Sequence, residues 1–384
     1  MIEQNSWWIG ERDKDIEEFE RLKIRYDPKW IKNIPMKPFS LNFVLGLRRV
    51  GKTLGIKILI QELLKKTNPY SIFYFNCEIL EGYKDLLEVL TDYLEMKTRK
   101  GIKNSFIFLD EITLLDDWWR AIKYLVDIHK FGDCVVTLLG SSSIYLTQHI
   151  ETFGGRRGMG KTIKVMPLDF PEYYSLHYRD YFKEASSRVF NKYMETGGYL
   201  AVLNRIIDET DIISLIKADL KKLERSTDIA RDIIRTILEK APSPMSYHSI
   251  ASNLGISTNT VKDYVEIFKN MFILREIPYM GMDGKIYMRK EKKIIVSDPF
   301  LARALGIWSR IDIRKDFLYE WMVQEHLYRR FDEVYYYRNR YEIDCIAGNL
   351  KIEVKAGKPH RRYPRGVMIL GEDDIPQFLM KQEG

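Results

Sequence analysis

The sequence has few cysteines and no long apolar run. Its 384 residues include three cysteines, Cys77, Cys134 and Cys345, whose odd number and scattered positions match neither a disulfide framework nor a metal-ligand spacing. This usage is typical of a reducing cytoplasm. No apolar stretch approaches the roughly 20 residues of a membrane span, and the charged start MIEQNSWWIGERDKD lacks the apolar core of a signal peptide. We therefore expect a cytoplasmic protein without a membrane partner.

The sequence also lacks low-complexity segments and a strong excess of one charge. It is 45% apolar and 30% charged, which is ordinary for a soluble globular chain with about two to four domains. The net charge of +7 and the pI of about 8.9 favour polyanionic partners but do not by themselves establish nucleic-acid binding. Predictions about function therefore depend on the sequence motifs.

A phosphate-loop motif follows directly after the apolar run LNFVL. Residues 46–53 read GLRRVGKT, which matches G-x-x-x-x-G-K-[ST]. Its glycines let the backbone fold around a polyphosphate at the positive end of a helix. Lys52 is expected to reach the β- and γ-phosphates of ATP, and Thr53 is expected to hold Mg²⁺. The residues expected to contact the nucleotide here are Gly46, Arg48, Arg49, Val50, Gly51, Lys52, Thr53 and Leu54.

Residues 41–165 alternate short apolar runs with amphipathic stretches. The runs LNFVL, SIFYFN, SFIFLDE and CVVTLLG predict the strands of a parallel, doubly wound α/β sheet. At the end of SFIFLDE, Asp110 is expected to bind Mg²⁺ through water, and Glu111 to polarise the attacking water. Solvated acids at a strand end are the alternative. Residues 1–40 carry Trp7, Trp8 and Trp30 and are expected to pack on this core.

Two further features near the expected nucleotide site are less specific. Ser141, which starts a serine triplet after Gly140, could sense the γ-phosphate, but serine-rich turns are common. Arg156 and Arg157, in the loop GGRRGMGK, suit charge neutralisation in the transition state, either in the same chain or from a neighbouring copy. A solvated basic loop, or one that touches nucleic-acid phosphate, would look the same.

The middle of the chain changes to helical patterns. Residues 166–227 are expected to form a helical lid, broken at the Gly197-Gly198 pair. Residues 228–291 contain three helical stretches and two strand-like runs, LREIPYM and KIYMRK, which flank MDG and are expected to pair as a hairpin. This order is typical of a winged helix.

The third helix of that winged helix would carry any contact with DNA. It would offer Thr258, Asn259, Lys262 and Asp263 to a major groove. A winged helix that serves only as a packing module is the alternative, because the two lysines of the exposed helix face are matched by two acids.

Residues 292–384 are expected to form a small α/β domain. Asp344 ends one strand-like run, and Glu353 and Lys355 lie on one face of the next. Asp344 and Glu353 could hold Mg²⁺ or Mn²⁺, Lys355 could stabilise charge or activate water beside the metal, and Glu320 could complete the carboxylate shell. This is the constellation of a PD-(D/E)xK nuclease, although a solvated strand face gives the same alternation. Six Lys or Arg residues between 351 and 365 suit contact with a phosphate backbone.

In their order, these motifs resemble a family of AAA-type ATPases, the archaeal-type ATPases of archaea and bacteria. The matching segments include GLRRVGKT, FLDEI, LLGSSS, PLDFPEYY, GGYL, KIIVSDPFLARAL, YEWMVQEHL and EID…KIEVK, which together cover nearly all of residues 40–358. The resemblance implies a P-loop AAA-type domain with a helical lid, a winged helix and a C-terminal PD-(D/E)xK-like domain. It implies ATP hydrolysis at Lys52, Thr53, Asp110 and Glu111.

The resemblance further implies a nuclease-like site at Glu320, Asp344, Glu353 and Lys355, but it leaves the substrate open. One hypothesis is an ATPase acting on DNA, whose nucleotide state controls a metal-dependent nuclease. A second is an ATP-dependent switch that binds nucleic acid or protein without cleavage. A third is a factor that remodels proteins. The oligomeric state stays open, because a ring, a dimer and a monomer fit equally well.

Overall fold

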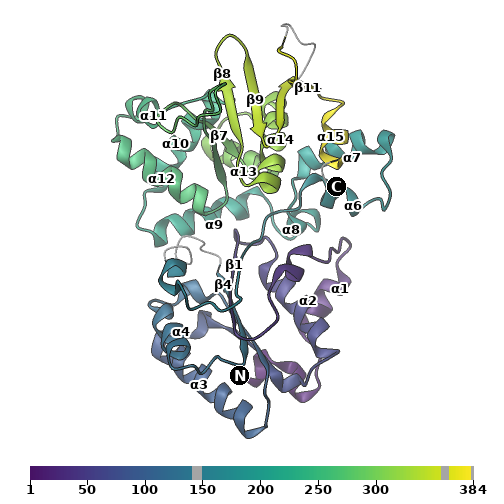
Figure 1. Ribbon diagram of the computed structural model, residues 1–384, viewed down its shortest axis with the longest axis vertical. Helices are drawn as coiled ribbons and strands as arrows, with labels where there is room; N and C mark the ends of the chain where they lie inside the picture. The colour runs from purple at the N-terminus through teal and green to yellow at the C-terminus, as the bar shows by residue number, and fades with distance from the viewer. Residues whose placement is uncertain (141–148, 356–362, 382–384) are drawn as a thin grey trace. The chain divides into compact units, whose positions relative to one another are not determined.

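The computed structural model describes residues 1–140, 149–355 and 363–381. The chain divides into two compact units, Met1–Met166 and Pro167–Gly384, and Figure 1 labels many of the helices and strands of both. Within the described ranges, no helix combines the length and the apolar character needed to cross a membrane.

The first unit is built on a parallel sheet. Its strands lie in the order β2 (Ile72–Asn76), β3 (Ser105–Asp110), β4 (Cys134–Gly140), β1 (Ser40–Leu45) and β5 (Thr162–Lys164), and every pairing is parallel. All residues of β1 and β4 are buried, which explains why these strands read as continuous apolar runs rather than as alternating ones. The expected parallel α/β sheet is confirmed.

Helices cover both faces of this sheet. On one side lie α1 (Lys14–Arg21) and α2 (Lys52–Leu64), and on the other α3 (Tyr83–Arg99) and α4 (Trp118–Asp127). The register pairs Leu45 with Gly140, so the β1 and β4 strands end level with one another. Asn76 is likewise paired with Asp110, at the carboxyl ends of β2 and β3. The phosphate loop and Asp110 therefore lie at the same edge of the sheet.

The N-terminal segment packs along the outer strand β2. The Asn5 side chain donates to the carbonyl of Tyr74 (2.9 Å) and accepts from its amide (2.8 Å). Trp7 Nε1 donates to the carbonyl of Ile72 (3.2 Å). These bonds satisfy edge groups of β2 that would otherwise be open to another strand.

The second unit starts with four helices, α6 (Phe170–Ser175), α7 (Lys183–Thr196), α8 (Leu200–Leu203) and α9 (Glu209–Lys222). Helix α7 ends at Gly197, where φ is +69° and an added Cβ would lie 2.3 Å from a carboxylate oxygen of Asp298. The amide of Gly198 donates to Asp298 Oδ2 at 2.8 Å. Asp298 also caps α13 (Pro299–Ser309) by accepting from the Phe300 amide. The glycine pair thus breaks the helix, as expected, and docks it on the start of α13.

Three further helices precede a two-stranded antiparallel sheet. They are α10 (Thr227–Lys240), α11 (Tyr247–Leu254) and α12 (Thr258–Asn270), and the Ser257 hydroxyl caps α12. Strand β6 (Leu274–Ile277) pairs with β7 (Lys293–Val296).

The pairing of β6 with β7 differs from the expected hairpin of LREIPYM with KIYMRK. The KIYMRK run makes a single antiparallel bridge, between Met280 and Ile286. Residues 282–291 are exposed, whereas all four residues of β7 are buried. Both runs have strand-like sequences, so burial of KIIV decided which of them pairs with β6.

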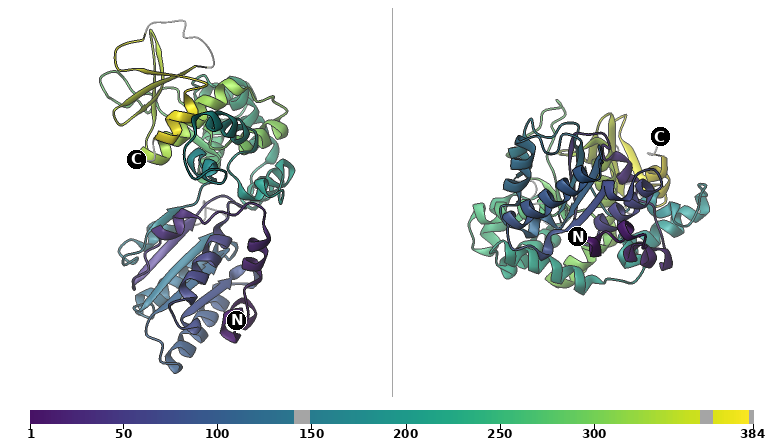
Figure 2. Two further views of the ribbon diagram at one scale, coloured as in Figure 1. Left: turned by 90° about the vertical axis from the view of Figure 1, so that its right-hand side faces the viewer. Right: turned by 90° about the horizontal axis from the view of Figure 1, so that it is seen from below.

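The last part of the chain forms a four-stranded sheet. The order is β11 (Met368–Gly371), β10 (Leu350–Lys355), β9 (Glu342–Ala347) and β8 (Tyr335–Arg338), antiparallel except for the β10–β11 pair. Helix α14 (Lys315–Phe331) packs on β9 and β10, and Figure 2 shows this part of the unit from the side. A final helix, α15 (Ile375–Lys381), follows β11.

Candidate functional site

The phosphate loop has a backbone that only small residues allow at two positions. An added Cβ at Gly46 would lie 2.4 Å from the carbonyl oxygen of Val165. Gly51, at the N-cap of α2, has φ of +99°, in the left-handed region that favours glycine. As the N-cap, Gly51 has no side chain that could bond the first amides of α2, and the positive end of a helix favours an anion.

Lys52 lies across this loop. Its side chain is buried, and its ammonium donates to the carbonyls of Gly46 (2.7 Å) and Leu47 (3.0 Å). The same carbonyl contacts hold the cation at the loop, where the motif requires it to meet a phosphate.

Thr53 and Asp110 are in direct contact. Thr53 Oγ1 donates to Asp110 Oδ2 at 2.6 Å, and Asp110 Oδ1 accepts from the amide of Glu111 at 2.9 Å. Burial raises the pKa of Asp110, and the hydrogen bond from Thr53 partly offsets this effect. A hydroxyl beside a carboxylate is an oxygen donor set of the kind that Mg²⁺ prefers. These residues therefore fit Mg²⁺ together with a nucleotide.

Glu111 stands immediately beyond the end of β3. Its φ of 51° is left-handed, which turns the chain sharply after Asp110. Such a backbone conformation in a non-glycine residue is uncommon and costs free energy. Glu111 thus lies beside the Thr53–Asp110 pair, as its expected role requires.

Ser141, the other residue expected at this edge of the sheet, lies outside the described residues.

Tyr74 is a member of this site that we did not expect from the sequence. Its hydroxyl donates to Asp110 Oδ2 at 2.9 Å from the neighbouring strand β2. Lys57 lies with its ammonium 3.8 Å from the centre of the Tyr74 ring and pairs with Asp13 at 2.7 Å. The available signal was a tyrosine among the phenylalanines of SIFYFN, but nothing local related it to a residue 36 positions away.

We expect Tyr74→Phe to weaken ATP hydrolysis mainly at low pH. The hydrogen bond from Tyr74 lowers the pKa of Asp110, so its loss raises that pKa further and shifts the acidic limb of the activity profile to higher pH. A hydrogen bond worth about 1 kcal/mol corresponds to a roughly five-fold lower rate on that limb. The measurement is kcat against pH.

Tyr93→Phe is the matched control for that experiment. The Tyr93 hydroxyl donates to the carbonyl of Tyr70 at 3.2 Å and does not touch Asp110. The two variants should therefore differ in their pH profiles, and identical profiles would show that Tyr74 does not act on Asp110.

The structure does not bring Arg156 and Arg157 together with Lys52. Arg156 pairs with Asp127 at the end of α4 (2.6 Å), and the Arg157 guanidinium lies 4.9 Å from the centre of the Phe43 ring. Their loop is bridged to the first residue of β1, about 17 Å along that strand from the phosphate loop. A role in the same chain's site is therefore disfavoured, and action on a neighbouring copy stays a prediction.

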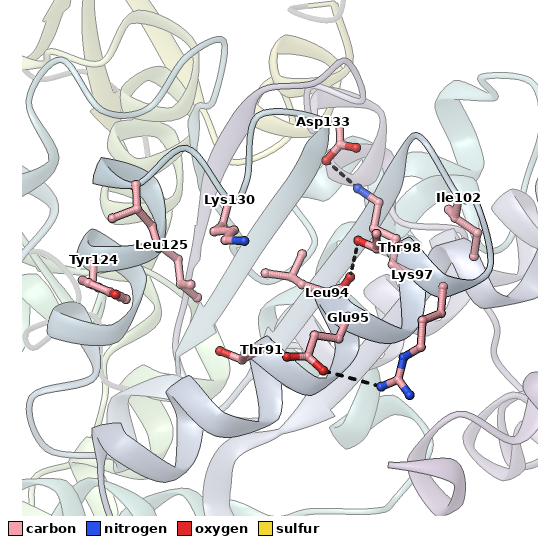
Figure 3. A pocket seen from close by; sticks show the side chains of 12 residues that line it. Thr91, Leu94, Glu95, Lys97, Thr98, Ile102, Tyr124, Leu125, Lys130 and Asp133 are labelled. Carbon is pink, nitrogen blue, oxygen red and sulfur yellow. Dashed lines mark hydrogen bonds and ion pairs between the residues drawn. The ribbon is translucent and has the colours of Figure 1, made fainter.

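A pocket of about 620 Å³ lies elsewhere in the first unit, between α3 and α4. Figure 3 shows Leu94 and Lys97 on one wall, Tyr124 and Leu125 on the other, and the ion pair of Lys97 with Asp133. Asp133 precedes β4 directly, so this pocket opens at the amino ends of the strands. The phosphate loop lies at their carboxyl ends, and the pocket is not part of the nucleotide site.

In the second unit, the residues expected to form a nuclease-like site do lie together, but around a lysine. Lys293 Nζ lies 2.7 Å from Glu320 Oε1, 2.7 Å from Asp344 Oδ1 and 2.9 Å from Glu342 Oε1. Lys293 was not among the residues expected here. The cluster of Lys293, Glu320, Glu342 and Asp344 is called the acidic cluster below.

Glu353 and Lys355 pair with each other beside the acidic cluster. Their charged atoms are 2.5 Å apart, and the Tyr363 hydroxyl donates to the same Glu353 oxygen at 3.0 Å. Burial raises the pKa of Glu353 to about 7, with the charge of Asp344 as the next cause. Asp344 and Glu353 are therefore neighbours, as the sequence predicted.

The electrostatics of the acidic cluster depend on Lys293. Burial, followed by the charge of Asp344, raises the pKa of Glu320 to about 8, although Lys293 acts in the opposite direction. Burial alone would lower the pKa of Lys293, yet Asp344 and Glu320 raise it well above its ordinary value, so the ammonium stays charged. In residues 1–140, 149–355 and 363–381, no group of three or more His, Cys, Asp or Glu side chains could hold a metal ion. With Lys293 in place, these carboxylates do not fit Mg²⁺ or Mn²⁺.

Comparison with known proteins assigns a domain family to the part of the chain that contains the first site. Residues 39–174 match a protein family described as an AAA domain, and residues 187–313 match one described as a domain of unknown function, DUF8612. A curated relative, described as an uncharacterized protein of Haemophilus influenzae, is 22% identical over 284 residues, which is 69% of each chain. The AAA match contains the phosphate loop, Asp110 and Glu111, and it confirms a P-loop AAA-type domain in this part of the chain.

Similar solved structures include two archaeal and one bacterial protein. The ORC2 protein of Aeropyrum pernix, in ADPNP and ADP complexes, has a TM-score of 0.42 at 9% identity, over 71% of this chain and 87% of that one. A RuvB variant of Thermotoga maritima has a TM-score of 0.30 at 17% identity, over 67% and 87%. Cdc6p of Pyrobaculum aerophilum has a TM-score of 0.29 at 13% identity, over 71% and 88%. The winged helix and the nuclease-like domain remain predictions.

Proposed function

We propose that this AAA-type protein hydrolyses ATP in its first unit and uses the nucleotide state to control binding of DNA by its second unit. The contact between Thr53 and Asp110 at the phosphate loop carries the first half of the proposal, because it joins the two halves of an NTPase site. Mg²⁺ held there would neutralise charge on the β- and γ-phosphates.

The residues of the first site have distinct roles in this proposal. Lys52 would exchange its bonds to the loop carbonyls for bonds to phosphate, and Thr53 and Asp110 would hold the metal. Glu111 orients the attacking water beside them. An arginine of a neighbouring copy would complete the site, which would make the active form a homo-oligomer.

The proposed DNA-binding surface combines a helix and a hairpin of the second unit. On α12, Thr258, Asn259, Lys262 and Asp263 are all exposed, so the face expected to meet a groove is free to do so. Beyond β6, the segment 281–292 is almost entirely exposed and is called the hairpin below. It carries four basic residues, Lys285, Arg289, Lys290 and Lys292, against Asp283 and Glu291.

Exposed apolar side chains on the same hairpin support nucleic acid as its partner. Met282, Ile286, Tyr287 and Met288 are 41% to 63% exposed. Apolar and aromatic side chains that alternate with basic ones can contact sugars and bases while the basic ones contact phosphates. A protein partner would be favoured instead if DNA binding were absent at low salt.

We expect the triple variant Lys285→Ala, Arg289→Ala and Lys290→Ala to lose salt-dependent DNA affinity. Each phosphate contact contributes about 0.9 to the slope of log K against log salt, so the slope should fall by up to about 2.7 and the affinity by about ten-fold or more. The measurement is duplex binding by fluorescence anisotropy across a salt series, with and without a non-hydrolysable ATP analogue.

A matched control removes three exposed lysines from the first unit, Lys23, Lys65 and Lys66. This control changes the net charge equally but leaves the hairpin intact. If both triple variants lower the slope by the same amount, the hairpin is not the binding surface. If the ATP analogue leaves the affinity of the unmodified protein unchanged, the switch part of the proposal is wrong.

A further inference from the structure

We infer that Lys293 is the resident cation of the acidic cluster, and that the second unit therefore has a metal-free site that does not cleave DNA. The lysine takes the position in which a PD-(D/E)xK nuclease would need a divalent metal. This inference concerns the acidic cluster alone and requires neither ATP hydrolysis nor DNA binding.

The ammonium of Lys293 is fully matched by its surroundings. A lysine ammonium has three N–H donors and no acceptor. Three carboxylates, those of Glu320, Asp344 and Glu342, lie within 2.9 Å of Nζ. The side chain of Lys293 is only 2% exposed, so these carboxylates replace water as its partners.

The carboxylates are held in place for this lysine by further hydrogen bonds. Asp344 Oδ2 accepts from the amide of Val354 at 2.9 Å, so both oxygens of Asp344 are engaged. Gln324 Nε2 donates to Glu320 Oε1 (3.0 Å) and to the carbonyl of Asp344 (2.9 Å). A metal that took the place of Lys293 would have to displace its bonds to Glu320 Oε1 and Asp344 Oδ1.

The backbone of Lys293 also prevents an easy withdrawal. Lys293 opens strand β7, where it is paired with Ile277 of β6. Moving its side chain out of the cluster would leave Glu320 and Asp344, both buried, without their counter-charge. Removing one partner from a buried ion pair is strongly unfavourable.

The remaining groups of the expected nuclease site do not supply a second metal position. Glu353 uses one oxygen for Lys355 and Tyr363, and among the described residues its other, buried oxygen has no hydrogen-bond partner. In the part of the chain that the structure describes, that oxygen is the one open ligand in this pair of acids, because Asp344 beside it is already bonded to Lys293 and to the Val354 amide. Glu353 and Lys355 thus form an ion pair without net charge beside the acidic cluster.

Binding of Mn²⁺ to the nucleotide-free protein tests this inference. In this titration every protein carries Asp110→Asn, which removes the acidic metal ligand proposed for the first unit. By electron paramagnetic resonance titration, the Asp110→Asn protein should bind no more Mn²⁺ than the same protein with Asp344→Asn added. Lys293→Met should gain a Mn²⁺ site that binds at least about ten-fold more tightly than any Mn²⁺ bound by the Asp110→Asn protein, because the carboxylates of Glu320, Asp344 and Glu342 are left without a cation.

Lys290→Met, an exposed lysine of the adjoining hairpin, is the control and should gain no site. A Mn²⁺ site in the Asp110→Asn protein that Asp344→Asn or Glu353→Gln removes would overturn the inference. So would nicking of duplex DNA by the unmodified protein with Mn²⁺ that Glu353→Gln abolishes. A folded Lys293→Met protein without a gained site would also contradict it. Should Lys293→Met fail to fold, the comparison with Asp344→Asn still decides.

Discussion

Lys52→Ala is expected to reduce ATP hydrolysis by at least about 100-fold, because it removes the cation that stabilises charge on the transferring phosphoryl group. The structure adds a second reason. The Lys52 ammonium bonds to the carbonyls of Gly46 and Leu47 at 2.7 and 3.0 Å, so alanine also removes the link across the phosphate loop. Both nucleotide affinity and turnover should therefore fall, as measured by a coupled ATPase assay and by binding of a fluorescent nucleotide.

Two comparison variants separate these effects. Glu111→Gln keeps the loop and the Thr53–Asp110 contact, so it should bind nucleotide normally and lose only turnover. Lys65→Ala, at the exposed end of the same helix α2, changes the charge equally and should leave both quantities unchanged. If Lys52→Ala retains more than about a tenth of the normal rate, the proposed site is not where ATP is hydrolysed.

Glu325→Ala is expected to destabilise the second unit by about 3–5 kcal/mol, because it leaves two buried guanidinium groups without their counter-charge. Glu325 lies on α14 and is 4% exposed. It accepts from Arg275 of β6 at 2.8 Å and from Arg329 of its own helix at 3.0 Å. Arg329 also donates to the carbonyl of Pro167 at 2.6 Å. Glu325 therefore joins α14 to β6 directly, and through Arg329 it is linked to Pro167 at the start of the unit.

The pH dependence of this contribution follows from the same contacts. Burial alone would raise the pKa of Glu325, but Arg275 and Arg329 outweigh it and lower the pKa below its ordinary value. A carboxyl whose pKa is lower in the folded state stabilises the fold above its unfolded pKa. That stabilisation is lost as the pH falls through the lowered value. The effect of Glu325→Ala should thus be full at neutral pH and shrink in acid.

Hydrogen exchange of α14 and β6, together with urea unfolding, would measure the effect of Glu325→Ala. Glu239→Ala is the control, since Glu239 pairs with Arg235 at 2.9 Å on the exposed side of α10. Exposed pairs of this spacing contribute only about 0.5 kcal/mol or less. If the two variants unfold alike, the buried triad does not hold this unit together.

The phosphate loop could be predicted because its residues are contiguous in the sequence. A phosphate loop is a contiguous turn between a strand and a helix, so Gly46 to Thr53 specify it without reference to distant residues. Asp110 and Glu111 followed from one rule of parallel sheets, that neighbouring strands end at the same edge. Tyr74 could not be predicted, because only the pairing of β2 with β3 shows that its hydroxyl reaches Asp110.

The second unit was harder to predict because its important contacts join distant residues. The Gly197-Gly198 pair was recognised as a helix break, but its partner Asp298 lies 100 positions away from Gly198. The predicted strand partner of β6 was wrong because the pairing likewise depends on residues distant in the sequence. KIYMRK and KIIV have comparable strand propensity, and burial in the folded unit chose between them.

The sequence by itself determined a parallel α/β core and its phosphate loop, since periodicity and a short motif encode them directly. The roles of Asp110 and Glu111 in ATP hydrolysis stay predictions. The sequence also determined that Glu320, Asp344, Glu353 and Lys355 would be neighbours. Only the tertiary structure decided what those neighbours surround. Lys293 lies 27 and 51 positions from Glu320 and Asp344, and it enters their cluster because β7 pairs with β6 rather than because of any local pattern. A buried ammonium among carboxylates is a product of packing. The sequence pattern of Glu320, Asp344, Glu353 and Lys355 would be the same if these residues surrounded a metal ion.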